Sequence, residues 1–197
     1  MEAFESFVAL SLEHEGFVVS EAVKFPVRRQ TRKRAYREIQ THGYEVDLVA
    51  ARGDRLVLAT VKSYFGSRGV AAEHVIGETA NESARNQYVL LNNPEVQSAV
   101  LTGAGERYGY PVSRIQLHLY VGKFAGQQAS QQQGRHETRI RQWCSAQNVG
   151  AGPIKVYGVL DVVEHVRLIA SRSQYRDNPV LVTLKVLEAA GLLPHLE

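Results

Sequence analysis

Two acidic residues and a lysine lie close together within residues 43–62, GYEVDLVAARGDRLVLATVK. Glu45 and Asp47 are two positions apart, and so are Thr60 and Lys62. Residues two apart on a strand point to the same face, so each pair shares a face if both runs are strands. Carboxylate oxygens suit Mg²⁺, and a nearby lysine can position or deprotonate a water that attacks a phosphodiester. The segment therefore predicts a site for metal-assisted hydrolysis.

The pattern around these residues predicts a tight antiparallel hairpin. The runs 44–50 and 55–63 are rich in apolar and β-branched residues, and the turn-forming residues 51–54 separate them. A hairpin of this kind brings the acidic, hydroxyl and lysine side chains near one another. The same alternation predicts that Val46 and Leu48 point to the face opposite the acids.

Hydrophobic periodicity and helix-ending residues predict the other elements. Gly16 is expected to end a first helix, and Pro94 suits the first turn of another. Asp161 and Asn178 are expected N-caps. Helices are expected at residues 2–15, 71–91, 94–107, 136–147, 161–173 and 178–190, and further strands at 17–27, 114–124 and 153–160. This order predicts a mixed α/β fold, a central mixed sheet flanked by helices with extra helices at the C-terminal end.

The composition narrows the class of protein. A chain of 197 residues with 44% hydrophobic and 22% charged residues suits one globular domain, with or without an appended lobe. No run is long and apolar enough to span a membrane, and the first residues do not resemble a secretory signal. A single cysteine, Cys144, forms no internal disulfide and suits a reducing compartment, so a cytoplasmic location is expected.

A cluster of basic residues precedes the hairpin. Its six members are Arg28, Arg29, Arg32, Lys33, Arg34 and Arg37. Such a cluster attracts a polyanion, so a loop that grips DNA phosphates is expected here; a solvated loop is the plainer alternative. The turn Ser67-Arg68-Gly69 follows the hairpin and can place Arg68 against a phosphate.

The hairpin resembles the PD-(D/E)xK nuclease superfamily, whose small Holliday-junction-resolvase-like members read GEIDLIA, a turn, then LVFVEVK. The matching text here is YEVDLVA, RGDR, then LVLATVK. The resemblance implies a divalent metal on Asp47 and a catalytic role for Lys62. The family also carries a glutamate in its first helix, ahead of the glycine that ends it; Glu5, eleven residues before Gly16, fits that position. The resemblance covers about residues 2–65.

The chain departs from the family at Thr60, where the family has the acid of its ExK pair. A threonine hydroxyl is a weak neutral ligand and brings no charge to balance a divalent cation. Three alternatives stay open. Glu45 takes the role of the acid, or Glu73 or Glu78 reaches in from the following helix, or the metal site is lost and the protein binds nucleic acid without cutting it.

The sequence thus predicts a Mg²⁺- or Mn²⁺-dependent DNA endonuclease-like protein. A restriction-endonuclease-like core is expected at residues 1–125, with a C-terminal extension at 126–197 packed on it. The expected metal ligands are Asp47, Glu5 and Glu45, with Thr60 and Lys62 completing the catalytic set. One alternative is a catalytically degraded nuclease fold that serves as a DNA-binding or assembly subunit; another is a protein–protein module whose basic loop meets an acidic partner. The family weakly implies a homodimer.

Overall fold

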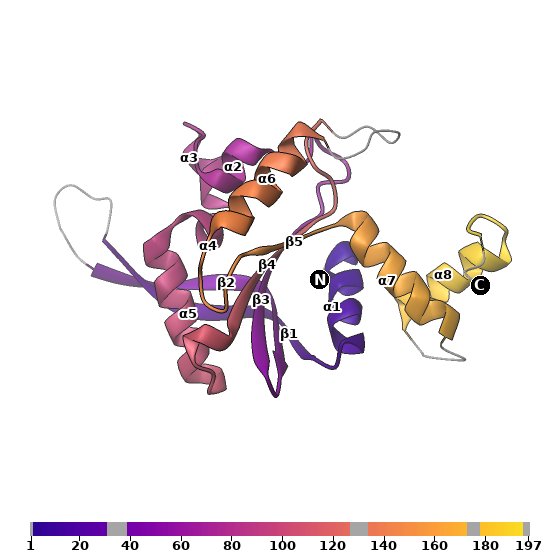
Figure 1. The fold of residues 1–197 in the computed structure, drawn as a ribbon, viewed down its shortest axis with the longest axis horizontal. Coiled ribbons are helices and arrows are strands. Elements are labelled where there is room, and N and C mark those ends of the chain that lie inside the picture. Colours follow the sequence, from indigo (N-terminus) through magenta and orange to yellow (C-terminus); the bar gives the residue numbers. More distant parts are fainter. Residues whose placement is uncertain (1, 31–38, 127–133, 173–177, 195–197) are drawn as a thin grey trace.

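The structure, a computed structural model, describes residues 2–30, 39–126, 134–172 and 178–194. Across these ranges a five-stranded sheet of order β1-β2-β3-β4-β5 carries helices on both faces (Figure 1). The strands are β1 (Val18–Gln30), β2 (Ile39–Arg52), β3 (Arg55–Lys62), β4 (Ile115–Val121) and β5 (Lys155–Gly158). The helices are α1 (Ala3–His14), α2 (Ala72–Ile76), α3 (Glu82–Asn86), α4 (Val89–Asn92), α5 (Pro94–Tyr108), α6 (Arg135–Ala146), α7 (Val159–Arg172) and α8 (Pro179–Ala189), with a 3₁₀ turn at Val112–Arg114. The predicted mixed α/β class is confirmed.

The sheet is antiparallel at one side and parallel at the other. β1, β2 and β3 pair antiparallel in sequence order, whereas β4 lies parallel to β3 and β5 parallel to β4. Parallel neighbours need a crossover, and helices α2 to α5 and then α6 supply the two crossovers. β3, the strand that ends in Lys62, therefore lies in the middle of the sheet.

Each face of the sheet has its own apolar core. Val46 and Leu58 face a core closed by α2, α4, α5 and α6, whereas Leu48 and Val57 face a core closed by α1, α7 and α8. Figure 1 shows the two groups of helices on opposite sides of the strands. No helix among the described residues is long and apolar enough to cross a membrane.

Local capping explains where the helices end. α1 stops as predicted, because Gly16 takes a left-handed conformation with φ of 87°. The single helix expected over residues 71–91 is wrong, since the segment forms three short helices. Gly77 ends α2 in the left-handed region, and the Asn81 side chain accepts a hydrogen bond from Ala84 N to start α3.

The residues after 133 complete both layers of the fold. Ile140 and Ile154 join the core on the α5 side, and Leu181 and Leu184 join the core on the α1 side. Asn178 caps α8 as predicted, since its side chain accepts hydrogen bonds from the first turn.

The predicted N-cap role of Asp161 is wrong. α7 already begins at Val159, and Asp161 lies in its first turn, where its carboxylate accepts a hydrogen bond of 2.7 Å from Gly158 N. An acid placed there still satisfies a backbone donor at the helix start.

The strands β1 and β2 form a long arm. Their pairing continues out to Gln30 and Ile39, and the paired ends project beyond the rest of the sheet (Figure 1). Arg28 and Arg29 therefore lie on β1, and the expectation that a loop begins at Arg28 is wrong, because cross-strand pairing extends the strand past its apolar alternation. Arg32, Lys33, Arg34 and Arg37 lie outside the described residues.

Candidate functional site

Asp47 lies where the pairing of β2 with both neighbours is interrupted. On one side Ala22 of β1 takes a φ of 50° and does not pair with Asp47, although the residues before and after it pair with β2. On the other side the pairing of β2 with β3 ends at Leu48 and Ala59. The strand turns over at this point, so Val46 and Leu48 face opposite cores. The prediction that these two share a face is therefore wrong.

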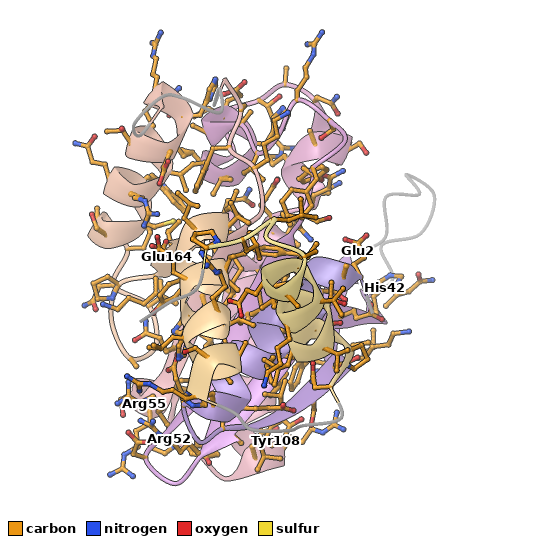
Figure 2. The ribbon with its side chains drawn as sticks, turned by 90° about the vertical axis from the view of Figure 1, so that its right-hand side faces the viewer. Glu2, His42, Arg52, Arg55, Tyr108 and Glu164 are labelled. Carbon is orange, nitrogen blue, oxygen red and sulfur yellow. The ribbon has the colours of Figure 1, made fainter. Side chains whose placement is uncertain are left out.

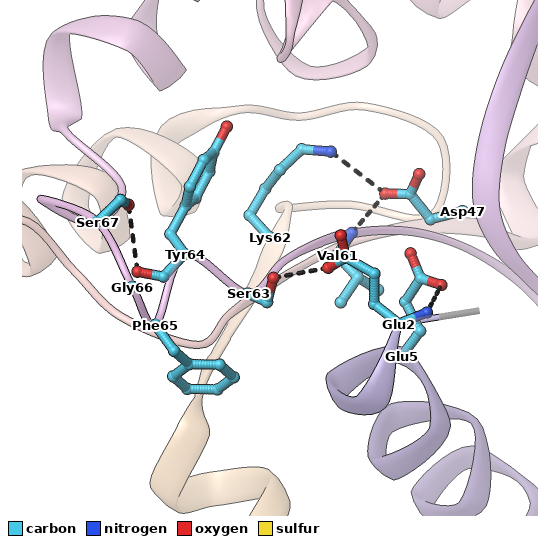
Figure 3. A pocket seen from close by; sticks show the side chains of 10 residues that line it. All are labelled: Glu2, Glu5, Asp47, Val61, Lys62, Ser63, Tyr64, Phe65, Gly66 and Ser67. Carbon is cyan, nitrogen blue, oxygen red and sulfur yellow. Dashed lines mark hydrogen bonds and ion pairs between the residues drawn. The ribbon is translucent and has the colours of Figure 1, made fainter.

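The interruption leaves the Asp47 carboxylate free to contact β3. Val61 N donates a hydrogen bond of 2.7 Å to Asp47 Oδ2, and Lys62 Nζ lies 3.5 Å from the same oxygen (Figure 3). The two charged side chains are only 21% and 23% exposed. A charge-assisted bond to a backbone N–H, together with an ion pair that is largely shielded from water, fixes the carboxylate beside the lysine.

The N-terminus of α1 brings two more carboxylates to the same place. Glu2 N donates a hydrogen bond of 2.9 Å to Glu5 Oε2, and Ser63 Oγ donates one of 2.6 Å to Glu2 Oε2. Acids are favoured at a helix start by the exposed N–H groups and by the helix dipole. The contact between Glu2 and Ser63 joins the start of α1 to the end of β3. Sequence reasoning missed Glu2 and Ser63. The acid-x-x-acid spacing of Glu2 and Glu5 before an apolar run is a capping signal that could have identified Glu2.

These residues surround one cavity of about 650 Å³. Its wall comes from Glu2 and Glu5 of α1, from Asp47 of β2, and from residues 61–67 at the end of β3 and in the loop beyond it (Figure 3). Figure 2 shows Glu2 far from Arg52 and Arg55, which flank the β2–β3 turn, so the cavity lies at the end of the hairpin away from its turn.

Two of the predicted site residues do not line the cavity. Glu45 pairs with Lys24 on β1 at 3.5 Å and is half-exposed, and Thr60 is buried in β3 with 4% exposure. The alternative acids lie elsewhere as well. Glu73 and Glu78 contact a histidine and an arginine of α6, at 3.5 and 2.8 Å. The structure thus brings together Glu5, Asp47 and Lys62 from the predicted set.

The donor set suits a hard divalent cation, because Asp47, Glu2 and Glu5 present carboxylate oxygens to the cavity. The hydrogen bond from Val61 N and the ion pair with Lys62 both use Oδ2 of Asp47. Within the described part of the chain, no group of three or more His, Cys, Asp or Glu side chains is already arranged around one metal position. A carboxylate has two oxygens, so Glu5 can keep its capping contact on Oε2 and present Oε1 to a cation.

The loop after Lys62 is held in a fixed shape. Tyr64 takes a φ of 46°, which is uncommon for a residue with a side chain, and its hydroxyl donates a hydrogen bond to Gln87. Gly122 N donates to Lys62 O, and an added Cβ at Gly122 would overlap the Ser63 carbonyl oxygen. The loop therefore packs directly on the end of β4.

Two of the basic residues predicted to contact DNA, Arg68 and Arg28, lie at different distances from the cavity. Arg68 is exposed in the loop whose residues 63–67 line it. Arg28 is exposed on the arm and borders a second cavity of about 860 Å³ between β1 and α5. Its cross-strand partner Thr41 is six residues from Asp47 along β2. That separation corresponds to about 20 Å at ~3.3 Å per residue.

The remaining titratable candidates are structural. His118 is buried, its Nδ1 lies 3.1 Å from the Tyr120 hydroxyl, and burial lowers its pKa to about 3. Burial raises the pKa of the Cys144 thiol to about 12, so the thiol stays protonated at neutral pH. Neither residue lines the cavity beside Asp47.

The fold and the cavity define a class: a mixed α/β protein in which carboxylates of α1 and β2 and a lysine of β3 meet at one cavity. No family model matches the chain, and no curated protein matches it. One similar solved structure is described as "Crystal Structure of Protein of Unknown Function AF1548". It has a TM-score of 0.39 and 15% identity, over 96% of this chain and 77% of that one. Similarity at this level carries no argument about fold family or function.

Proposed function

We propose that the protein is a divalent-metal-dependent endonuclease-like hydrolase that acts on DNA, built on a restriction-endonuclease-like core. One observation carries the proposal. Glu5, Asp47 and Lys62 come from three separate elements, and all three line the same cavity. These are the residues that the PD-(D/E)xK resemblance selects, and the sequence pattern alone did not require the α1 glutamate to lie near the hairpin.

Each residue has a distinct role in this proposal. Asp47 and Glu5 hold Mg²⁺ or Mn²⁺, which when bound supplies Lewis-acid stabilisation of the charge that develops on the phosphate. Lys62 lies next to the Asp47 carboxylate, and its ammonium group orients the attacking water. Glu2 adds a carboxylate at the edge of the cavity and is tied to β3 through Ser63.

DNA contacts follow from the positions of the basic residues. Arg68 lies close to the cavity, and the arm that carries Arg28 begins about 20 Å from Asp47 at ~3.3 Å per residue. That span corresponds to about six base pairs, since each strand places one phosphate per ~3.4 Å along the helix axis. In this proposal Arg28, Arg29 and the basic residues after them bind backbone phosphates on one side of the scissile bond.

A second candidate function is a DNA-binding or assembly subunit that keeps the fold without cutting. Thr60, which replaces the family acid, is buried and uncharged. The Lys62 ammonium already neutralises Asp47. Both observations favour a site that is stable without a metal ion.

Cleavage of labelled DNA in the presence of Mg²⁺ tests the first candidate. Asp47→Ala and Lys62→Ala are each expected to lower the cleavage rate by about 100-fold or more, because each removes a group placed at the reaction. Glu45→Ala is the matched control, since Glu45 lies two residues away on the same strand and pairs with Lys24 instead. Cleavage that survives both of the first two changes in purified protein would refute the proposal.

Metal binding separates the two candidate functions. Calorimetry with Mn²⁺ on the wild type should show a site that Asp47→Ala removes and Glu45→Ala retains if the enzyme proposal holds. DNA binding without any Mn²⁺ site, and without cleavage, would favour the subunit.

A homodimer and a cytoplasmic location stay predictions. α8 exposes Val182 and Val186, at 42% and 60%, which is an apolar strip that a second copy could cover. Sedimentation of the purified protein tests the dimer.

A further inference from the structure

An aromatic side chain stands exposed at the edge of the cavity. Phe65 lines the same cavity as Asp47 and Lys62, and it is 54% exposed. Scattered exposed apolar side chains are ordinary on a protein surface. Phe65 differs because its ring borders the site where the scissile phosphate would lie.

The Phe65 ring is held in place from two sides. Its edge meets the Phe4 ring of α1, with ring centroids 5.5 Å apart and planes at 83°. A Cβ on Gly122 would come within 2.7 Å of the ring, so β4 also approaches it closely. These two contacts hold the ring in one position, which lowers the entropy cost of stacking a ligand on it.

The backbone before Phe65 separates the two aromatic rings of the loop. Tyr64 takes its positive φ of 46°, and Figure 3 shows Tyr64 and Phe65 on opposite sides of the loop. The Tyr64 hydroxyl donates a hydrogen bond to the Gln87 side chain. Both rings line the cavity, and Phe65 is the more exposed of the two and the one whose ring has no polar group held by another side chain.

We infer that Phe65 stacks on an unpaired nucleobase beside the scissile phosphate, so that the substrates are DNA with unpaired bases: single strands, flaps or frayed ends. The inference rests on the proposed function. Stacking on an aromatic side chain requires a base with an accessible face, and inside an intact duplex both faces are covered by neighbouring bases. The carboxylates and Lys62 then act on the backbone, and Phe65 acts on the base.

The test compares a single-stranded oligonucleotide, a flapped duplex and a blunt duplex of the same sequence. Cleavage is measured for the wild type, Phe65→Leu and Phe65→Trp, with Val112→Ala as a control at a comparably exposed apolar position away from the cavity. In parallel, the quenching of 2-aminopurine within the single strand reports stacking without requiring cleavage. Thermal unfolding confirms that each variant is folded.

The expected result is preference for the single strand and the flap over the blunt duplex. Phe65→Leu should lower cleavage of the unpaired substrates by about 5- to 150-fold, the range that loss of one stacked base corresponds to. Phe65→Trp should retain both cleavage and quenching, and Val112→Ala should match the wild type.

The two proposals fail in distinguishable ways. Cleavage with equal rates on all three substrates, or rates unchanged in Phe65→Leu, would overturn the stacking inference and keep the nuclease. Quenching that Phe65→Leu abolishes, without cleavage by the wild type, would keep the stacking and overturn the nuclease. Absence of both cleavage and quenching would overturn both.

Discussion

Acidification should destabilise the protein through His118, a residue outside the candidate site. The imidazole lies in β4, 9% exposed, with its Nδ1 against the Tyr120 hydroxyl. Burial lowers its pKa to about 3, with smaller contributions from the positive charges of Lys155 and Arg55. The folded protein therefore holds this histidine neutral well above pH 3.

The sign of the effect follows from proton binding. The unfolded chain binds a proton on this histidine below about pH 6.5, whereas the folded chain does not until about pH 3, so stability falls as the pH is lowered between these values. With these two pKa values the loss from pH 7 to pH 5 is roughly 2 kcal/mol, and the loss from pH 7 to pH 3 is roughly 4 kcal/mol.

The substitution that isolates this contribution is His118→Asn. The asparagine amide can take the place of Nδ1 against Tyr120, and it does not titrate. Urea unfolding of the wild type and the variant at pH 7 and pH 5 gives the free energy of unfolding at each pH. The wild type should lose roughly 2 kcal/mol more than the variant over this range, whatever their difference at pH 7. Equal losses would refute the assignment of this acid sensitivity to His118. The substitution His42→Gln, at an exposed position on the arm, controls for the loss of a histidine as such.

Two further predictions test the packing around the site and the core. Gly122→Ala should destabilise the fold by about 1 to 3 kcal/mol, because its Cβ would overlap the Ser63 carbonyl oxygen. Gly66→Ala, in the loop that contains Ser63, is the control, since its Cβ meets nothing within 4 Å. Urea unfolding that finds both variants equal would contradict this. Cys144 should resist iodoacetamide at pH 8 until the protein is unfolded, since burial raises the pKa of its thiol to about 12. The free energy of unfolding should fall as the pH rises from about 9 towards 12, because over this range the thiol ionises in the unfolded chain and not in the folded one. Rapid labelling of the native protein would show that the thiol is accessible.

Local sequence signals predicted most of the helices and strands, because capping and turn residues decide where these elements start and end. Pro94 and Asn178 start helices where their capping chemistry places them, and the two-residue turn at Gly53-Asp54 closes the β2–β3 hairpin. The break of the segment at 71–91 was harder to foresee. Its apolar residues recur at helical spacing, yet Gly77 ends one helix and Asn81 starts the next.

The site was only partly predictable, because one backbone irregularity decides which side chains reach it. Strict alternation placed Glu45 beside Asp47, but β2 turns over at Asp47, opposite the positive φ of Ala22 on the neighbouring strand. Glu45 consequently meets Lys24 on the exposed side. Nothing in the residue types of β1 signals this, since alanine rarely adopts that conformation.

Within the nuclease proposal, the same geometry accounts for a threonine at position 60, where the resembling family has an acid. One position beyond the last β2–β3 pair, Asp47 comes level with Thr60, which is 4% exposed. A carboxylate at that buried position would lie near Asp47 and would be costly without a cation to balance it. Threonine removes that cost, and Lys62 alone neutralises Asp47. Within the nuclease proposal, the negative charge that a divalent ion requires then comes from Glu2 and Glu5. Metal binding therefore depends on the contact between Glu2 and Ser63, which holds the start of α1 against β3.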